Sequence, residues 1–215
     1  MVKPLIVLVV VIIAVAAFFG WDYYRRGVVG PVVKLQQVVQ KPFDKYTYES
    51  LIKTEFSPSE VTIGSLVSDN PEFVSRMFYF YVGGPSTRSG TLGQANPGQA
   101  KKVSGLVNFP KKDGTYPVIV MYRGYIDRET YKTGDGTRRS GEMFAQNGFI
   151  TVAPDFLGYG QSDMPAGNPM EERFQVYTAA ITLLKSIPNL NKAFTSAGTG
   201  VRADAAKVGI LYRRY

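Results

Sequence analysis

Residues 117–163 constrain the fold of this chain most, because they hold two short apolar runs on either side of a helix-length segment. The first run, residues 117–125, is rich in β-branched side chains and ends in a turn, as is typical of a strand buried on both faces. A short helix with an Asn-Gly stop signal is expected at residues 140–148, and a second strand at residues 149–153. This order predicts a βαβ unit with two parallel strands.

The segments around this unit extend the predicted sheet. Alternation or aromatic enrichment predicts strands at residues 61–68, 75–82 and 102–109. Short helices are expected at residues 46–55 and, with apolar side chains at helical spacing, at residues 170–187, where Pro188 follows as a stop. Residues 189–205 are polar and rich in Gly and Ala, and residues 207–211 begin another buried strand. The predicted fold is α/β, with N-terminal antiparallel strands leading into parallel βαβ units.

Residues 4–21 are almost continuously apolar and are followed by Trp, Tyr and Arg residues. An apolar stretch of roughly 17 residues or more can span a bilayer, and Trp and Tyr favour its interfaces. The sequence therefore predicts a single-pass N-terminal membrane helix that contacts lipid and holds the domain at the membrane, exported or facing the cell envelope. The alternative is a cleavable signal peptide ending near Ala16, against which stand the bulky Phe18 and Phe19. The expected organisation is an anchor or signal segment at 1–26, a stalk with a short helix at 27–60, and a domain at 61–215.

Composition limits the chemistry. The chain contains no cysteine and no histidine, so it lacks the commonest general base and the commonest metal ligand. The formal net charge of +8 comes from scattered Lys and Arg residues without a basic stripe. We therefore expect a solvated basic surface, with no nucleic-acid partner, no cofactor and no metal.

Short motifs add little by themselves. No Gly-x-Ser-x-Gly occurs anywhere in the chain. The pair Gly158 and Gly160 lacks the third glycine of a dinucleotide fingerprint and indicates a turn. Ser50 and Lys53 match the Ser-x-x-Lys of penicillin-binding enzymes, but both companion motifs are missing, so the match indicates chance.

The arrangement of residues 100–211 resembles the α/β-hydrolases. The features that carry the likeness are a Tyr-Arg-Gly-Tyr turn at residues 122–125, the helix ending in Asn-Gly, and the Pro-Asp-Phe-Leu-Gly-Tyr-Gly-Gln-Ser loop at residues 154–162. The pattern is most similar to the catalytic domains of prolyl oligopeptidases and acylaminoacyl-peptidases. This resemblance implies a partial α/β-hydrolase sheet behind the N-terminal transmembrane helix.

The same resemblance implies site residues. Tyr122 matches a tyrosine whose hydroxyl donates to the oxyanion, and Tyr125, after the turn residue Gly124, offers its backbone N–H as the other donor. The turn that supports such a site would be formed by Gly124 together with the loop residues Asp155, Gly158, Gly160 and Ser162.

The likeness fails at its end. The family's Gly-His-Ser is replaced here by Tyr212, Arg213 and Arg214, so the nucleophile position falls at Arg214. The triad aspartate and histidine have no counterpart, and acyl transfer by the usual route is not available. One edge of the strand at residues 207–211 is expected to be unpaired.

Two hypotheses follow. The first is the N-terminal fragment of a membrane-anchored serine hydrolase, a peptidase or esterase, truncated by a frameshift or an incomplete gene and inactive by itself. A peptide or ester substrate belongs only to the full-length form. The second is a complete, non-catalytic, membrane-tethered binding module with an α/β-hydrolase-like fold.

Overall fold

The computed structural model describes residues 3–28, 43–83 and 100–212. Internal contacts divide the chain into two units, Met1–Lys41 and Pro42–Tyr215. In the first unit the described part is helix α1 (Lys3–Val28), whose apolar side chains from Val9 to Phe19 are largely exposed. Within the described residues, no helix combines the length and the apolarity that a bilayer span requires. The membrane anchor expected at residues 4–21 therefore stays a prediction.

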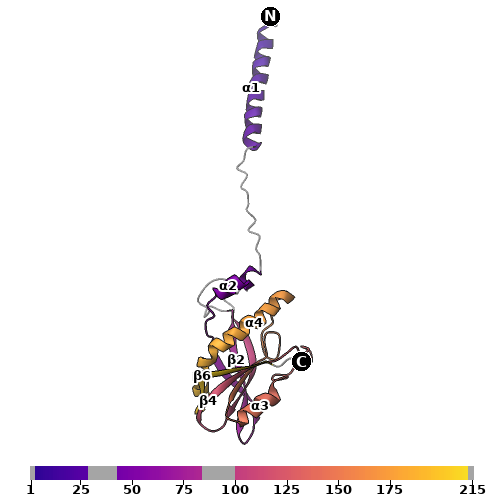
Figure 1. The fold of residues 1–215 in the computed structure, drawn as a ribbon. Helices are drawn as coiled ribbons and strands as arrows, with labels where there is room; N and C mark the ends of the chain where they lie inside the picture. Colours follow the sequence, from indigo (N-terminus) through magenta and orange to yellow (C-terminus); the bar gives the residue numbers. More distant parts are fainter. Residues whose placement is uncertain (1–2, 29–42, 84–99, 213–215) are drawn as a thin grey trace. The chain divides into compact units, whose positions relative to one another are not determined.

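The second unit is built on a six-stranded mixed sheet, shown in Figure 1. Its spatial order is β1-β2-β3-β5-β4-β6. Strands β1, β2, β3 and β5 pair antiparallel in turn, whereas β4 runs parallel to both β5 and β6. The bounds are β1 (Val61–Asp69), β2 (Phe73–Val82), β3 (Lys101–Pro110), β4 (Gly114–Tyr122), β5 (Ile150–Pro154) and β6 (Val201–Tyr212). The α/β class, with antiparallel strands leading into a parallel βαβ unit, is confirmed.

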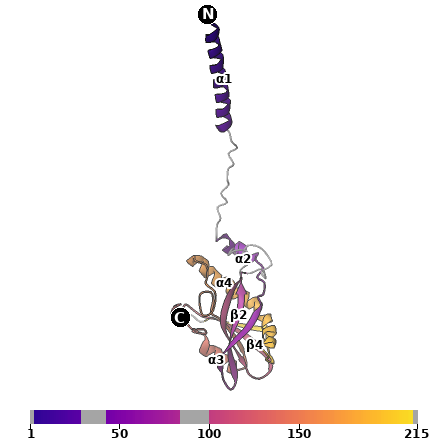
Figure 2. The same ribbon diagram turned by 180° about the vertical axis from the view of Figure 1, so that it is seen from behind.

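Helices lie on both faces of this sheet, as Figure 1 and the reverse view in Figure 2 show. On one face, α4 (Pro169–Ser186) and α5 (Leu190–Ser196) cover the main core, in which Val107 and Val152 are fully buried. Side chains alternate along a strand, so the neighbours Asn108 and Thr151 point to the other face. There they hydrogen-bond to each other at 2.8 Å beneath α3 (Arg138–Gln146).

Helix α4 begins where local chemistry favours a start. The side chain of Asn168 accepts hydrogen bonds from the N–H groups of Met170 and Glu171, and proline occupies the first helical position. The two acidic residues in the first turn, Glu171 and Glu172, also suit the positive end of the helix dipole. The helix expected at residues 170–187 is therefore present with nearly the expected bounds.

The segment before β1 is attached to α4. It contains the 3₁₀ helix η1 (Asp44–Tyr46) and α2 (Tyr48–Ile52), where one helix at residues 46–55 was expected. The Tyr46 ring stacks on Phe174 with centroids 4.5 Å apart, and Lys45 forms an ion pair with Glu171. At the other end of α4, the Ser59 N–H donates to the Ser186 hydroxyl at 2.7 Å.

Residues 189–205, where the sequence indicated only a polar composition rich in Gly and Ala, hold all of α5 and the first part of β6. After the 3₁₀ turn η2 (Ile187–Asn189), α5 buries Leu190, Ala193 and Phe194. The Asn191 side chain forms two hydrogen bonds with the main chain of Ala203. It therefore pairs with the main-chain N–H and C=O of this residue as a neighbouring strand would. Strand β6 consequently begins at Val201, six residues before the expected start.

Candidate functional site

The candidate site lies at the carboxyl end of β4, where the order of the strands reverses. The chain passes from β4 through α3 to β5 on one side of β4, and then through α4 and α5 to β6 on the other side. In open α/β sheets, ligands bind outside the carboxyl ends of the strands at such a switch point. Tyr122, the last residue of β4, is the Cα partner of Tyr212 in β6.

Strand β6 is the outer strand of the sheet in the part of the chain that the structure describes. Its pairing with β4 has an irregularity, because Pro117 is opposite Asp204 and the next residue, Val118, is opposite Val208. From Val208 onward β6 exposes apolar side chains, including Ile210 and Tyr212. Arg214, the expected nucleophile position, lies outside the described residues.

Tyr122 closes β4 with its hydroxyl already engaged. The O–H donates to the carbonyl oxygen of Ala180 in α4 at 2.9 Å, and the ring lies beside Phe156. Burial of the phenol raises the pKa of Tyr122 well above its usual range, so the group stays a neutral donor. Its role in binding an oxyanion stays a prediction, and it requires the hydroxyl to leave Ala180.

The turn after β4 presents a different donor. The Tyr125 N–H has no hydrogen-bond partner among the described residues, and the Tyr125 side chain is 81% exposed. The carbonyl oxygen of the preceding residue, Gly124, accepts a hydrogen bond from Arg123 Nη1 at 3.0 Å. The Gly124 carbonyl of this turn is therefore hydrogen-bonded, whereas the Tyr125 N–H has no partner among the described residues.

Asp155, directly after β5, is the centre of a buried polar cluster. Its side chain is fully buried, and its two carboxylate oxygens accept hydrogen bonds from three hydroxyl groups. The donors are Ser104 Oγ at 2.5 Å, Thr133 Oγ1 at 2.9 Å and Tyr131 OH at 2.6 Å. The cluster therefore joins β3, the loop before α3 and the loop after β5, and its first effect is structural.

Burial and hydrogen bonding act on the pKa of Asp155 in opposite directions. Burial raises the pKa of Asp155, while the hydrogen bonds from Ser104, Tyr131 and Thr133 and the nearby Arg123 charge lower it; burial has the larger effect. The side chain is fully buried and both of its oxygens are hydrogen-bonded to protein hydroxyl groups. We assign it a supporting role.

The loop residues named from the sequence come together around Asp155. Gly160 has φ of +56°, and a Cβ there would lie 2.3 Å from Asp155 Oδ2, so only glycine fits this close approach. Ser162 Oγ accepts from the Ser104 N–H at 2.9 Å. Gly158 also has a positive φ, of +78°. The structure therefore places Gly160 directly against Asp155, and it links Ser162 to Asp155 through Ser104. Gly158 lies in the same loop.

Arg123 is the residue that the sequence analysis missed. It is only 9% exposed, and its Nη2 donates to the main-chain oxygen of Asp155 at 2.9 Å. The guanidinium carbon lies 4.5 Å from the ring centre of Tyr131 and 4.1 Å from that of Tyr159. The sequence feature that could have indicated Arg123 is an arginine directly after a buried strand, together with aromatic residues in both neighbouring loops.

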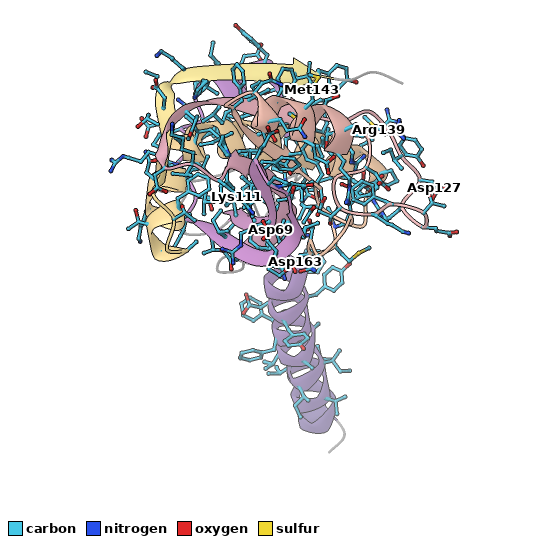
Figure 3. The ribbon with its side chains drawn as sticks, turned by 90° about the horizontal axis from the view of Figure 1, so that it is seen from below. Asp69, Lys111, Asp127, Arg139, Met143 and Asp163 are labelled. Atoms are coloured by element: carbon cyan, nitrogen blue, oxygen red, sulfur yellow. The ribbon has the colours of Figure 1, made fainter. Side chains whose placement is uncertain are left out.

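Other candidates lie elsewhere. Ser50 and Lys53 belong to the α2 region, where the Ser50 hydroxyl accepts from Thr47. A cavity of about 240 Å³ lies between the start of β1 and α5, and it is lined by none of the residues at the carboxyl ends of β4 and β6. Asp69 and Lys111, labelled in Figure 3, form a surface ion pair. No group of three or more potential metal-binding side chains is found in the described ranges.

Comparisons with solved structures give distant similarity to several esterases. An acetyl xylan esterase from Paenibacillus sp. R4 aligns at 20% identity and a TM-score of 0.44, over 73% of this chain and 46% of that one. Acetyl Xylan Esterase 1 from Thermoanaerobacterium sp. aligns at 15% identity and 0.45, over 80% and 50%. A variant of the rice cell wall degrading esterase LipA from Xanthomonas oryzae gives 14% and 0.44, over 74% and 42%.

No family model and no curated protein sequence matches the chain. The chain spans about half the length of these esterases or less. The α/β class of the sheet rests on its own strand pairing. The membership in the α/β-hydrolases and in their prolyl oligopeptidase-like group that the sequence suggests stays a prediction.

Proposed function

We propose that these 215 residues supply the N-terminal part of a membrane-anchored serine hydrolase of the esterase or peptidase type, and that they do not hydrolyse a substrate by themselves. The observation that carries the proposal is the place of β6 beside β4 at the switch point, where Tyr212 is the register partner of Tyr122, the last residue of β4. In this arrangement a nucleophile after β6 would stand close to the oxyanion donors of the turn after β4.

The exposed edge supports the same proposal. Val208, Ile210 and Tyr212 lie on β6 as neighbours of Val118, Val120 and Tyr122 on β4. Isolated apolar side chains at a surface are ordinary, but a row of them along an outer strand is typical of a surface that other polypeptide covers. A further helix of a complete hydrolase, packed on this face of the sheet, would cover these side chains.

The proposed inactivity rests on the residues present. The sequence has Arg214 at the expected nucleophile position and contains no histidine to serve as a base. A serine hydroxyl is a weak nucleophile unless a neighbouring base takes its proton. The described serines at the candidate site, Ser104 and Ser162, are instead bound within the Asp155 cluster.

A fluorophosphonate probe tests this proposal on the purified full chain. We expect no labelled serine by mass spectrometry and no hydrolysis of p-nitrophenyl acetate above that of the Ser162→Ala variant. Labelling of any serine would contradict the proposed inactivity.

Sequencing the gene beyond codon 215 tests the proposal that these residues belong to a longer hydrolase. If they do, we expect a segment that codes for Gly-x-Ser-x-Gly in a continued or shifted frame. Its absence, with cooperative thermal unfolding of the chain, would favour the binding module.

Membrane attachment through residues 4–21 is part of the proposal. It is supported by the apolar sequence and by the exposed side chains of α1, such as Ile13 and Phe18. Extraction of expressing cells with alkaline carbonate tests it, since an anchored chain stays in the pellet. Recovery of the uncut chain in the supernatant would exclude the anchor.

A further inference from the structure

Arg123 is buried without a carboxylate partner. Among the described residues no Asp or Glu oxygen forms an ion pair with it, although Asp155 is near enough to influence it electrostatically. Its hydrogen bonds instead go to two main-chain oxygens, those of Gly124 and Asp155, while its Nε is buried without a hydrogen-bond partner among the described residues. A buried cation is costly unless it is hydrogen-bonded, so the bonds from Nη1 and Nη2 to the backbone are the ones that hold this side chain.

The aromatic rings hold the guanidinium in place. Tyr131 and Tyr159 lie against it and meet edge to face, with ring centroids 5.2 Å apart. Each ring is itself fixed by its hydroxyl, which donates to Asp155 Oδ1 from Tyr131 and to the Ile126 oxygen from Tyr159. Arg123 Nη1 and Nη2 are therefore presented in a fixed orientation to the two carbonyls.

Holding the Gly124 oxygen also orients the next N–H. A trans peptide is planar, with its C=O and N–H pointing in opposite directions, and the described residues contain no cis peptide bond. The Gly124–Tyr125 peptide thus directs the Tyr125 N–H away from Arg123. That N–H has no partner among the described residues, and it follows a strand that ends at the switch point.

We infer that Arg123 is the positioning residue of this turn: its hydrogen bond to the Gly124 oxygen holds the Tyr125 N–H ready to donate to a developing oxyanion. The part played by the oxyanion rests on the proposed function, but the positioning does not. A donor that is already oriented costs no reorganisation during the reaction. Lysine has a single ammonium and no planar fork, so it does not reproduce the contact with both carbonyls.

The experiment is NMR on the full chain, ¹⁵N-labelled, in detergent micelles. In the wild type we expect the Tyr125 amide to exchange rapidly with water and yet to be ordered, with an order parameter of about 0.85. In Arg123→Lys we expect that order parameter to fall below about 0.6, while the amides of β5 keep their values. The matched control is Arg128→Lys, because Arg128 also lies over Tyr159 but pairs with Glu172 and bonds no carbonyl of the turn.

An unchanged Tyr125 order parameter in a folded Arg123→Lys variant would overturn the inference. If that variant does not fold, the wild type decides. A scalar coupling across the hydrogen bond between Arg123 Nη1 and the Gly124 carbonyl carbon supports the positioning, and averaged Arg123 Nη signals like those of exposed arginines refute it. None of these signals depends on hydrolysis, so a failure of the proposed function leaves them readable.

Discussion

The two sides of β4 differ in how far their side chains are buried. On the β5 side the sheet ends in a closed polar cluster, in which Asp155 is fully buried and both its oxygens are hydrogen-bonded. On the β6 side the outer strand leaves Ile210 59% exposed and Tyr212 63% exposed. Within the described residues, the same central strand therefore has buried groups on one side and exposed side chains on the other.

One row of side chains shows the change directly. Val152, Val120 and Ile210 are register partners on β5, β4 and β6. The first two are fully buried, whereas Ile210 is mostly exposed, although neighbouring strands are only about 4.8 Å apart. The comparison teaches that β5 contributes to the core at this level of the sheet, whereas β6 contributes surface from Val208 onward, although Val201 and Ala203 at its start are buried.

The largest effect is expected for Asp155→Ala. The variant removes the acceptor of three buried or half-buried hydroxyl groups, each of which costs about 1–3 kcal/mol when left unsatisfied. We expect the free energy of unfolding to fall by about 3–5 kcal/mol, measured by urea unfolding followed by circular dichroism. Asp127→Ala is the control, since Asp127 lies at the rim of the domain in Figure 3 and, among the described residues, its side chain accepts only from the nearby Glu129 N–H. Equal losses in the two variants would contradict the central role of the cluster.

Two glycines separate backbone strain from crowding. Gly160 and Gly198 both have positive φ, but a Cβ at Gly160 would collide with Asp155 and a Cβ at Gly198 would meet nothing within 4 Å. Gly198→Ala should cost about 1 kcal/mol from strain alone, and Gly160→Ala about 2–3 kcal/mol. Thermal unfolding midpoints of the two variants test the difference, and a larger loss at Gly198 would count against the tight approach of the loop to Asp155.

The register partners Val120 and Ile210 give the sharpest comparison across β4. Val120→Ala leaves a cavity in the core and should cost about 2 kcal/mol. Ile210→Ala changes an exposed side chain, so its effect should stay within about 0.5 kcal/mol. Urea midpoints measure both. A loss at Ile210 as large as that at Val120 would mean that the β6 edge is covered in solution, for example by a second molecule, and a concentration series of the midpoint would detect this.

The smallest effect is a pH dependence. Because the pKa of Asp155 is raised above its ordinary value of 3.8, the folded state binds the proton more tightly than the unfolded state. The contribution of Asp155 to the free energy of unfolding is therefore largest below pH 3.8 and declines as the pH rises through the folded-state pKa. Asp155→Asn cannot titrate, so the difference in urea midpoint between wild type and variant should change with pH in that window. A constant difference would show that burial does not shift this group.

The sequence predicted the β5 side well because its signals are local. The apolar run of β4, the short helix α3 and the buried β5 are continuous segments, and the glycines of the following loop mark turns by themselves. The Pro-Asp loop was placed in the site for its resemblance, and the structure gives the physical reason, since Gly160 lets the chain pass close to Asp155.

The missed features depend on contacts between distant segments. Asn191 hydrogen-bonds the main chain of β6 from a helix 12 residues away in the sequence, which no periodicity reveals, so residues 201–206 were not predicted as part of this strand. Arg123 was passed over in favour of Tyr122, because only the folded chain shows that Tyr131 and Tyr159 enclose it. A phenol was expected at the turn, and its hydroxyl is instead bound to the Ala180 oxygen in α4.

The attachment of residues 43–60 to α4 has a mechanical consequence. A pull transmitted along the chain from its N-terminal side reaches the Tyr46–Phe174 stack and the Lys45–Glu171 pair first, and then the Ser59–Ser186 bond. These contacts attach the segment to α4 near both ends of the helix. Glu171 and Ser186 are about 22 Å apart along the helix at 1.5 Å per residue. The load is therefore shared along a helix before it reaches β1, which a direct pull would peel from β2 one hydrogen bond at a time. In a single-molecule pulling experiment, Phe174→Ala should lower the first rupture force, and an unchanged force would show that β1 bears the load.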